Sequence, residues 1–324
     1  MKALLCHEFG PIDTLRLTEV PDPVPGPGEV IVSMKAAGLN FPDTLIVQGK
    51  YQLQPPLPFA PGIEFAGTVR ALGAGVTGFT PGDRVFASVN WGALAEQVKV
   101  PANALIRLPA NLDFTPAAVL KASYGTGYHG LVTRGGLKAG ETLVVLGAAG
   151  GVGSAAVELG RLLGARVIAC ASSPEKLAFC RHLGADAVID YSHEDLKERI
   201  KALTGGAGAD VVYDPVGGDH AEPALRALAR EGRYLVIGFA AGGIPRIPLN
   251  LALLKQISII GVFLGGWEPH HREEFAADMQ KLMEWCCSGR IQPAITRTLP
   301  LSRAVEGLQL LARRQATGKI VITC

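Results

Sequence analysis

The chain has 324 residues, 48% of them hydrophobic and 19% charged, which is enough for two domains with separate cores. Its net charge of +2 lacks the basic excess of a dedicated nucleic-acid-binding protein, and its longest apolar runs are too short to cross a bilayer. Six scattered cysteines, and a first segment without an apolar run of signal-peptide length, predict a cytoplasmic protein.

The first third of the chain is rich in turn signals. Up to about Val100, short alternating runs are interrupted by proline and glycine, as in PDPVPGPGEVIVSM (21–34) and TPGDRVFASV (80–89). Brief strands of this kind predict a small antiparallel barrel or sandwich.

From residue 139 the pattern changes to apolar strands that alternate with amphipathic helices. Six such strands in succession predict a Rossmann-type, doubly wound parallel sheet. The expected strands lie within 141–148, 165–171, 186–191, 209–216, 233–239 and 257–263.

The tail after about residue 265 is too short to form a domain. It holds two expected helices, 272–289 and 301–315, and a closing strand, 318–323. We expect it to pack on the first third. The predicted domains are therefore 1–122 with 265–324, and 123–264 for the dinucleotide.

The stretch VVLGAAGGVGSAA (144–156) joins the first of these strands to a helix. Ala148, Gly150 and Gly153 occupy the three positions of a dinucleotide fingerprint, with alanine in place of the first glycine. Small residues let the backbone approach a pyrophosphate at a helix N-terminus. The predicted phosphate turn is Ala149, Gly150, Gly151, Val152 and Gly153.

The end of the next strand indicates which dinucleotide binds. An acidic residue there would hold the ribose 2′-hydroxyl of NAD, but the chain has Ser172, Ser173 and Lys176, and Glu175 lies inside the following helix. Two hydroxyls and an ammonium suit a 2′-phosphate, which favours NADPH. Ser173 could instead be only a helix cap.

Motifs for other chemistry are missing. The chain has no nucleophile-elbow serine, Cys-x-x-Cys pair or His-Glu-x-x-His motif, and His270 and His271 are expected in a solvated loop. Cys286 and Cys287 would lie on different faces of one helix and could not share a ligand.

Four features together resemble the medium-chain dehydrogenases/reductases: the barrel-like front with a GroES-like character, the GAAGGVG turn, the TPGDRV turn and the TGKIVI ending. The most similar branch is the zinc-independent quinone oxidoreductases, the zeta-crystallin group. In zinc-dependent members a cysteine and a histidine hold the metal, whereas this chain has Asn40 and Ile63 in those segments and no four-cysteine lobe. The resemblance implies no metal and reduction of a quinone or an α,β-unsaturated carbonyl.

The resemblance also assigns roles to residues. Asn40 and Tyr51 correspond to residues of the active-site cleft between the domains, and Thr126 to the threonine beside the nicotinamide, with Trp267 near the mouth. Tyr191 is expected near the 2′-phosphate. The backbone at Gly238, Phe239, Phe263, Leu264 and Gly265 is expected to hold the ribose and carboxamide ends.

Some of these roles have alternatives. Several members of the group carry a second tyrosine where this chain has Leu45, so solvent is expected to protonate the product. Tyr51 could be only a cleft wall, and Asn40 could be only a loop cap.

Two other functions remain open. One is an enoyl- or acryloyl-CoA reductase, for which Arg246, Lys255 and Arg272 could bind the CoA phosphate. The other is a low-turnover NADPH-binding protein, or one that binds RNA, and the weak net charge disfavours dedicated RNA binding. The apolar strand at 257–263 predicts a homodimer formed through the last strand of the parallel sheet.

Overall fold

The computed structural model describes residues 1–324 and contains two compact units, Met1–Ala122 with Met283–Cys324, and Ser123–Leu282. The first boundary coincides with the expected one, but the second lies at Met283 and not at residue 265. Most of helix α10 (Arg272–Cys287) therefore belongs to the unit of the parallel sheet. A physical reason is that Lys281 Nζ donates to Tyr128 Oη at 3.1 Å, which holds α10 to that unit.

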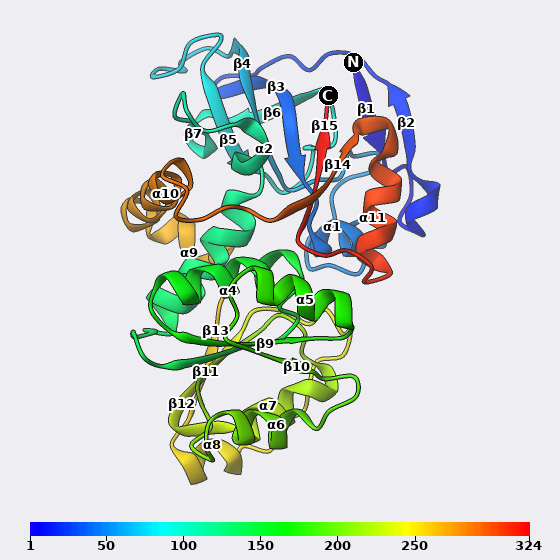
Figure 1. The fold of residues 1–324 in the computed structure, drawn as a ribbon. Helices are drawn as coiled ribbons and strands as arrows, with labels where there is room; N and C mark the ends of the chain where they lie inside the picture. The colour runs from blue at the N-terminus through cyan, green and yellow to red at the C-terminus, as the bar shows by residue number, and fades with distance from the viewer. The chain divides into compact units, whose positions relative to one another are not determined.

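The first unit is built on a seven-stranded sheet of order β14-β15-β3-β4-β5-β7, in which β6 also pairs with β3 (Figure 1). All pairs are antiparallel except β14 with β15. A separate hairpin joins β1 and β2. The strands are β1 Lys2–Leu5, β2 Arg16–Glu19, β3 Glu29–Gly38, β4 Glu64–Leu72, β5 Arg84–Ser88, β6 Gln97–Pro101, β7 Ile106–Arg107, β14 Ile295–Pro300 and β15 Lys319–Thr323.

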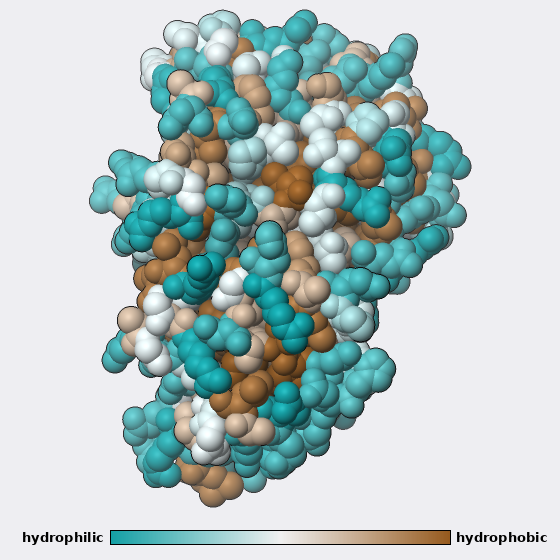
Figure 2. Space-filling model, in the orientation of Figure 1, coloured by the Kyte–Doolittle hydropathy of each residue, from teal (hydrophilic) through white to brown (hydrophobic).

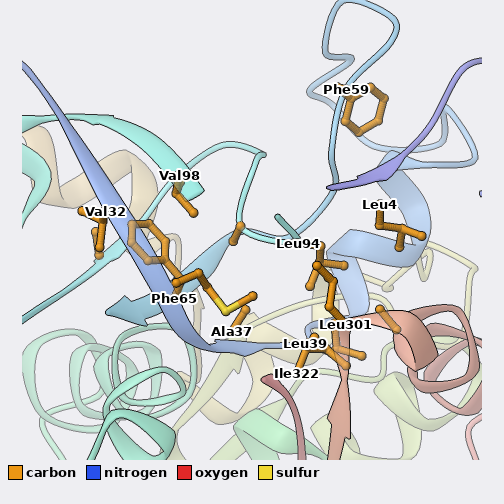
Figure 3. Packing of buried hydrophobic residues seen from close by; sticks show 14 of the residues in the cluster. Leu4, Val32, Ala37, Leu39, Phe59, Phe65, Leu94, Val98, Leu301 and Ile322 are labelled. Carbon is orange, nitrogen blue, oxygen red and sulfur yellow. The ribbon is translucent and has the colours of Figure 1, made fainter. Parts of the chain in front are cut away.

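The core of this unit forms because alternate strand residues are apolar and point to one side of the sheet. Figure 3 shows Val32, Phe65 and Val98, from β3, β4 and β6, near one another. Leu301 and Ile322 from the end of the chain belong to the same buried cluster, so the tail from Met283 completes this core as expected. The helices of the unit are α1 Phe41–Ile46, α2 Phe114–Ala117 and α11 Ala304–Ala312, with short 3-10 turns at Ile12–Thr14, Ala102–Ala104 and Leu301–Arg303.

The second unit contains a six-stranded, fully parallel sheet of order β10-β9-β8-β11-β12-β13. This confirms the predicted Rossmann-type fold, since the chain begins in the middle of the sheet, moves to one edge and returns to build the other. Helices α4 and α5 lie on one face and α6, α7 and α8 on the other (Figure 1). The elements are β8 Thr142–Val145, α4 Gly151–Leu162, β9 Arg166–Ala171, α5 Pro174–His182, β10 Ala187–Asp190, α6 Leu196–Leu203, β11 Ala209–Asp214, α7 Ala221–Arg226, β12 Leu228–Val236, α8 Asn250–Lys255 and β13 Ser258–Gly261.

Short helical segments complete this unit. Helix α3 (Thr126–Tyr128) lies between two π-helical segments, Leu120–Gly125, which begins in the first unit, and His129–Arg134. Helix α9 (Leu264–Trp267) and a 3-10 turn (Glu268–His270) follow β13, where a solvated loop was expected for the histidines, and a second 3-10 turn lies at Gly218–His220. None of the helices in the structure is both long enough and apolar enough to cross a membrane.

Candidate active site

The glycine turn adopts the geometry that a dinucleotide site needs. Gly147 has a φ of +55°, and Gly150 is the N-cap of α4. A Cβ at Gly153 would lie 2.3 Å from Gly147 O, so only glycine permits this close contact between helix and turn. Ala148 N–H donates to Cys170 O at 3.0 Å and ties the turn to the end of β9. The first peptide N–H groups of α4 have no partner within the helix and are available to an anion.

The residues predicted to select the cofactor lie at the neighbouring strand ends. Lys176 Nζ donates to Ser172 Oγ at 3.4 Å, so these two side chains are together. Ser173 is the N-cap of α5, and its hydroxyl oxygen accepts from Lys176 N–H at 3.3 Å. Tyr191 N–H donates to Ala171 O at 3.2 Å, which holds Tyr191 next to the end of β9.

Tyr191 also borders a cavity of about 730 Å³. Its ring lies 4.3 Å from that of His220, centroid to centroid. The two rings form an aromatic wall that a planar ligand group could contact. The rim carries both signs of charge, from Glu194, Asp195, Lys197, Asp219, Glu222, Arg226 and Arg246.

Asp214, at the end of β11, connects the two loops that follow β11 and β12. Its buried carboxylate accepts from Val216 N–H at 2.6 Å and Gly217 N–H at 2.9 Å, and Tyr234 Oη donates to its other oxygen. Its carbonyl accepts from Gly238 N–H at 3.3 Å. Asp214 therefore fixes the backbone at Gly238, one of the predicted cofactor contacts.

Thr126 begins α3, which packs against the helix of the glycine turn. A Cβ at Gly127 would lie 2.9 Å from Leu159 Cδ1 on α4. Both helices belong to the same unit, so this contact joins the helix that Thr126 begins to the helix that follows the phosphate turn. Insertions of π-helix beside Thr126 are typical of functional positions.

A stack of three rings lies one turn beyond Thr126. Trp267 packs on His129 with centroids 4.5 Å apart and on His271 at 4.7 Å. Burial, together with Arg134 and His271, lowers the pKa of His129 to about 4, so this ring is neutral at neutral pH. The stack fixes α9, whose first residues Leu264 and Gly265 follow Phe263, an exposed residue and its N-cap.

Asn40 lies in the other unit and takes part in a buried polar network. Asn40 Nδ2 donates to Gly38 O at 3.2 Å and to Glu64 Oε1 at 2.9 Å. Lys319 Nζ donates to Asn40 Oδ1 at 2.7 Å, to Glu64 Oε1 at 3.0 Å and to Leu39 O at 2.9 Å. Glu64 and Lys319 form an ion pair, and they are only 1% and 3% exposed.

Asp43 is buried beside this network. Asn40 and Asp43 form a capping box on α1, in which Asn40 N–H donates to Asp43 Oδ2 at 2.8 Å. The other carboxylate oxygen of Asp43 has no partner. Burial raises the pKa of Asp43 to about 7, against the opposing effects of the Asn40 N–H and the Lys319 ammonium.

Tyr51 is a half-buried residue that packs against the core of this unit. Burial raises the pKa of its phenol, and the nearby Asp43 adds to the effect. The phenol therefore stays protonated at neutral pH and can donate a hydrogen bond.

Ile63 lies next to Glu64, as the sequence indicates, and offers no ligand atom. No group of three or more His, Cys, Asp or Glu side chains in the structure is arranged to hold a metal ion.

Sequence reasoning missed the partners of Asn40. Glu64 and Lys319 are charged residues at the heads of apolar strands, EFAGTV and KIVIT, and that position was the available signal. Asp43 and Asp214 were also missed. Each lies where a helix or loop begins. Carboxylates are common at such positions because they accept hydrogen bonds from nearby backbone N–H groups, so their presence there did not indicate a site.

A GroES-like first unit and a Rossmann-type second unit with a dinucleotide turn define the class of medium-chain dehydrogenases/reductases. Residues 26–110 match the family described as alcohol dehydrogenase GroES-like domain, and residues 151–285 match the family described as zinc-binding dehydrogenase. Quinone oxidoreductase-like protein 2 of Rattus norvegicus is 38% identical over 324 residues, which cover 99% of this chain and 92% of that protein.

Two further relatives indicate the same family. The quinone oxidoreductase of Homo sapiens is 31% identical over 325 residues, which cover 99% of this chain and 97% of that protein. The crystal structure of Escherichia coli quinone oxidoreductase complexed with NADPH matches with a TM-score of 0.94 and 32% identity over 100% of both chains. The chain therefore belongs to the quinone oxidoreductase family, and the predicted resemblance is confirmed.

Proposed function

We propose that the protein transfers hydride from NADPH to a quinone or an α,β-unsaturated carbonyl, without zinc. The observation that carries the proposal is the pairing of a dinucleotide turn at α4 with the Lys176–Ser172 contact at the end of β9. The E. coli relative of similar fold is described as complexed with NADPH, which supports the same cofactor here.

The residues present fit this cofactor. Gly153 leaves the space that a Cβ would fill, and the free N–H groups of α4 suit the pyrophosphate, together with Ala149, Gly150, Gly151 and Val152. Lys176 and Ser172 suit the 2′-phosphate, because an ammonium gives a charge-assisted hydrogen bond and a hydroxyl adds a second donor. The aromatic wall of Tyr191 and His220 suits a planar base.

When bound, reduced nicotinamide supplies the hydride. The protein's own contribution is to orient the reactants and to exclude water. We assign Thr126 to the nicotinamide side and the backbone at Gly238, Phe239, Phe263, Leu264 and Gly265 to the ribose and carboxamide. We assign Tyr51, whose phenol stays protonated, to orienting the acceptor oxygen. Solvent then supplies the proton to the reduced product.

Zinc independence rests on the side chains at the two segments where zinc-dependent relatives hold metal. Asn40 has its amide engaged by Glu64, Lys319 and Gly38, and Ile63 is apolar, so neither offers the sulfur or imidazole that zinc prefers. We expect purified protein to contain no stoichiometric zinc and to keep its activity in a chelator. One zinc per chain, with activity lost to the chelator, would contradict this.

The CoA-dependent alternative is less well supported. Lys255, one of the three cations that could bind a CoA phosphate, donates to Arg226 O at 2.6 Å and to Leu228 O at 2.8 Å. Its ammonium is therefore engaged with the protein's own carbonyls.

We also propose a homodimer. Strand β13 is an edge of its sheet, pairing only with β12. Seven of the ten large hydrophobic side chains that are exposed lie between residues 239 and 263. They include three leucines at α8, where Figure 2 shows apolar surface at the bottom of the view. An unpaired edge beside such a surface favours association with a second copy.

The test is NADPH oxidation across a panel of quinones, enals and enoyl-CoA thioesters. We expect turnover with quinones or enals and little with thioesters. Turnover confined to thioesters would support the CoA-dependent alternative, and the absence of turnover with every acceptor would contradict the proposed function.

A further inference from the structure

A buried phenol and a buried carboxylate lie beside each other near the carboxyl ends of β11 and β12. Asp214 ends β11 and Tyr234 lies on β12, and they are only 2% and 3% exposed. Tyr234 pairs with Val212, so it shares a face of the sheet with Asp214, two residues further along β11. Tyr234 Oη donates to Asp214 Oδ2. Burial, and then the carboxylate beside it, raise the pKa of the Tyr234 phenol, so the phenol stays protonated and is the donor of this bond.

The two carboxylate oxygens of Asp214 have different partners. Oδ1 accepts from Val216 N–H at 2.6 Å and from Gly217 N–H at 2.9 Å, at the start of the loop that follows β11. Oδ2 accepts from Tyr234. Without the phenol hydroxyl, Oδ2 would be buried with no donor, and rotation of the carboxylate to find one would release the N–H groups of the loop. Tyr234 therefore holds Asp214 in the orientation in which Asp214 holds the loop.

The loops that follow β11 and β12 are joined to each other. A Cβ at Gly217, whose φ is +65°, would lie 2.8 Å from Phe239 Cδ1, so glycine permits this close contact between the loops. An orientation set at Asp214 is passed on to the second loop through backbone hydrogen bonds. These bonds run from Ile237 N–H and Gly238 N–H to Asp214 O, from Ala240 N–H to Pro215 O, from Ala241 N–H to Val216 O, and from Gly218 N–H to Gly243 O.

One peptide donor of the second loop has no partner in the protein. Between Ile237 and Gly242, every backbone N–H group donates to a backbone oxygen except that of Phe239. Phe239 is 38% exposed, so this part of the loop is accessible to a ligand. Because the N–H groups of Gly238 and Ala240 on either side are both bonded, the free N–H group is held in one place and is pre-organised to bind an acceptor oxygen.

We propose that Tyr234 and Asp214 are positioning residues that hold Phe239 N–H in place for an acceptor oxygen of the nicotinamide half of NADPH. The inference rests on the proposed function, which assigns Phe239 to the ribose and carboxamide of that half. Tyr234, Asp214 and Phe239 all belong to the parallel-sheet unit, Ser123–Leu282.

The effect of this pair should be confined to the nicotinamide half. Lys176 and Ser172, which we assign to the 2′-phosphate, follow β9, and β8 separates β9 from β11 in the sheet. His220, in the aromatic wall assigned to the base, is the N-cap of α7 and is anchored by that helix. A change at Tyr234 should therefore leave binding of the adenosine half unchanged.

The experiment compares Tyr234→Phe with Tyr213→Phe, its matched control. Tyr213 lies on β11, is fully buried and has no partner for its hydroxyl, so both changes delete one buried hydroxyl from neighbouring strands. Calorimetric titration measures binding of NADPH and of adenosine 2′,5′-bisphosphate, a fragment that carries the 2′-phosphate but no nicotinamide. Steady-state kinetics with a quinone and thermal unfolding are measured for each protein.

We expect Tyr234→Phe to weaken NADPH binding by about three- to tenfold, the effect of losing one hydrogen bond, and to change binding of the fragment by less than about twofold. The kcat at saturating NADPH should fall while the KM for the quinone stays unchanged. The reason is that a less well oriented nicotinamide reaches the geometry for hydride transfer less often. Tyr213→Phe should bind both ligands as wild type does and should unfold at no lower a temperature, because its hydroxyl has no bond to lose.

Three results would overturn the inference. A lower melting temperature for Tyr234→Phe, with NADPH binding and kcat unchanged, would make the pair purely structural. Equal losses for NADPH and for the fragment would place the effect on the adenosine half. A similar loss of NADPH binding in Tyr213→Phe would show that deleting any buried hydroxyl of this sheet has the same effect.

If Tyr234→Phe does not fold, combining it with Asp214→Asn removes the buried charge that has lost its partner, and the same expectations apply. The asparagine oxygen can still accept from Val216 N–H. Failure of the wild-type protein to bind NADPH would contradict the proposed function itself. Normal binding by wild type that Tyr234→Phe leaves unchanged would contradict only the inference.

Discussion

Replacing Asp43 by asparagine should make the stability of the protein less dependent on pH. The folded protein holds the pKa of Asp43 at about 7, whereas the ordinary value is 3.8. A raised carboxyl pKa means that folding favours the protonated form, so wild-type stability is greatest below about pH 4 and falls as pH rises towards 7. The full difference of about 3 pKa units corresponds to about 4 kcal/mol. Between pH 5 and pH 8 the expected loss is about 2.5 kcal/mol.

The assay is thermal or urea unfolding at several pH values between 5 and 8. In Asp43→Asn the side-chain oxygen can still accept from Asn40 N–H, but no carboxylate is left to ionise. Wild type should lose about 2.5 kcal/mol relative to the variant over this range, or roughly 5–10 °C in Tm. Asp13→Asn, at an exposed aspartate of the same unit, is the control and should follow wild type. Parallel pH profiles for wild type and Asp43→Asn would refute the reasoning.

Three further predictions concern the cofactor, the acceptor and the assembly. Lys176→Ala should weaken NADPH binding about tenfold or more, the loss of a charge-assisted contact, and leave NADH binding nearly unchanged; equal losses for both, or a wild-type preference for NADH, would contradict the 2′-phosphate assignment. Tyr51→Phe should keep kcat within about tenfold, because the phenol orients the acceptor without supplying the proton; a thousandfold fall with KM unchanged would identify Tyr51 as the acid. Light scattering should give twice the chain mass of 34.0 kDa at micromolar concentration, and a monomer mass would exclude the dimer.

The sequence was sufficient to predict most of the fold of the second unit. Its six strands and the turn around Gly150 were predictable because each depends on local properties: an apolar run, a helical period, and small residues where a backbone must turn tightly. The Lys176–Ser172 pair could also be predicted from the sequence, since the two residues are four positions apart at the start of one helix. The family resemblance added Asn40, Tyr51 and Thr126, but from motif position alone.

Within that unit, two local features could be settled only by the fold. The hydrogen bond from Lys176 N–H to the Ser173 hydroxyl, which makes Ser173 the cap of α5, is one of them. Residues 265–282 looked like part of the tail, but α10 is held to the parallel-sheet unit by contacts such as Lys281 with Tyr128. Both outcomes depend on which partners lie within reach in three dimensions.

By itself, the sequence determined the two-unit architecture, the dinucleotide turn and the family. Only the tertiary structure decided which groups the Asn40 amide contacts, because its partners Glu64 and Lys319 lie 24 and 279 residues away along the chain. Whether a buried charge is paired, and which way an amide faces, depends on groups that only folding brings together. The same holds for the pKa of Asp43, which burial raises although its neighbours in the sequence are ordinary.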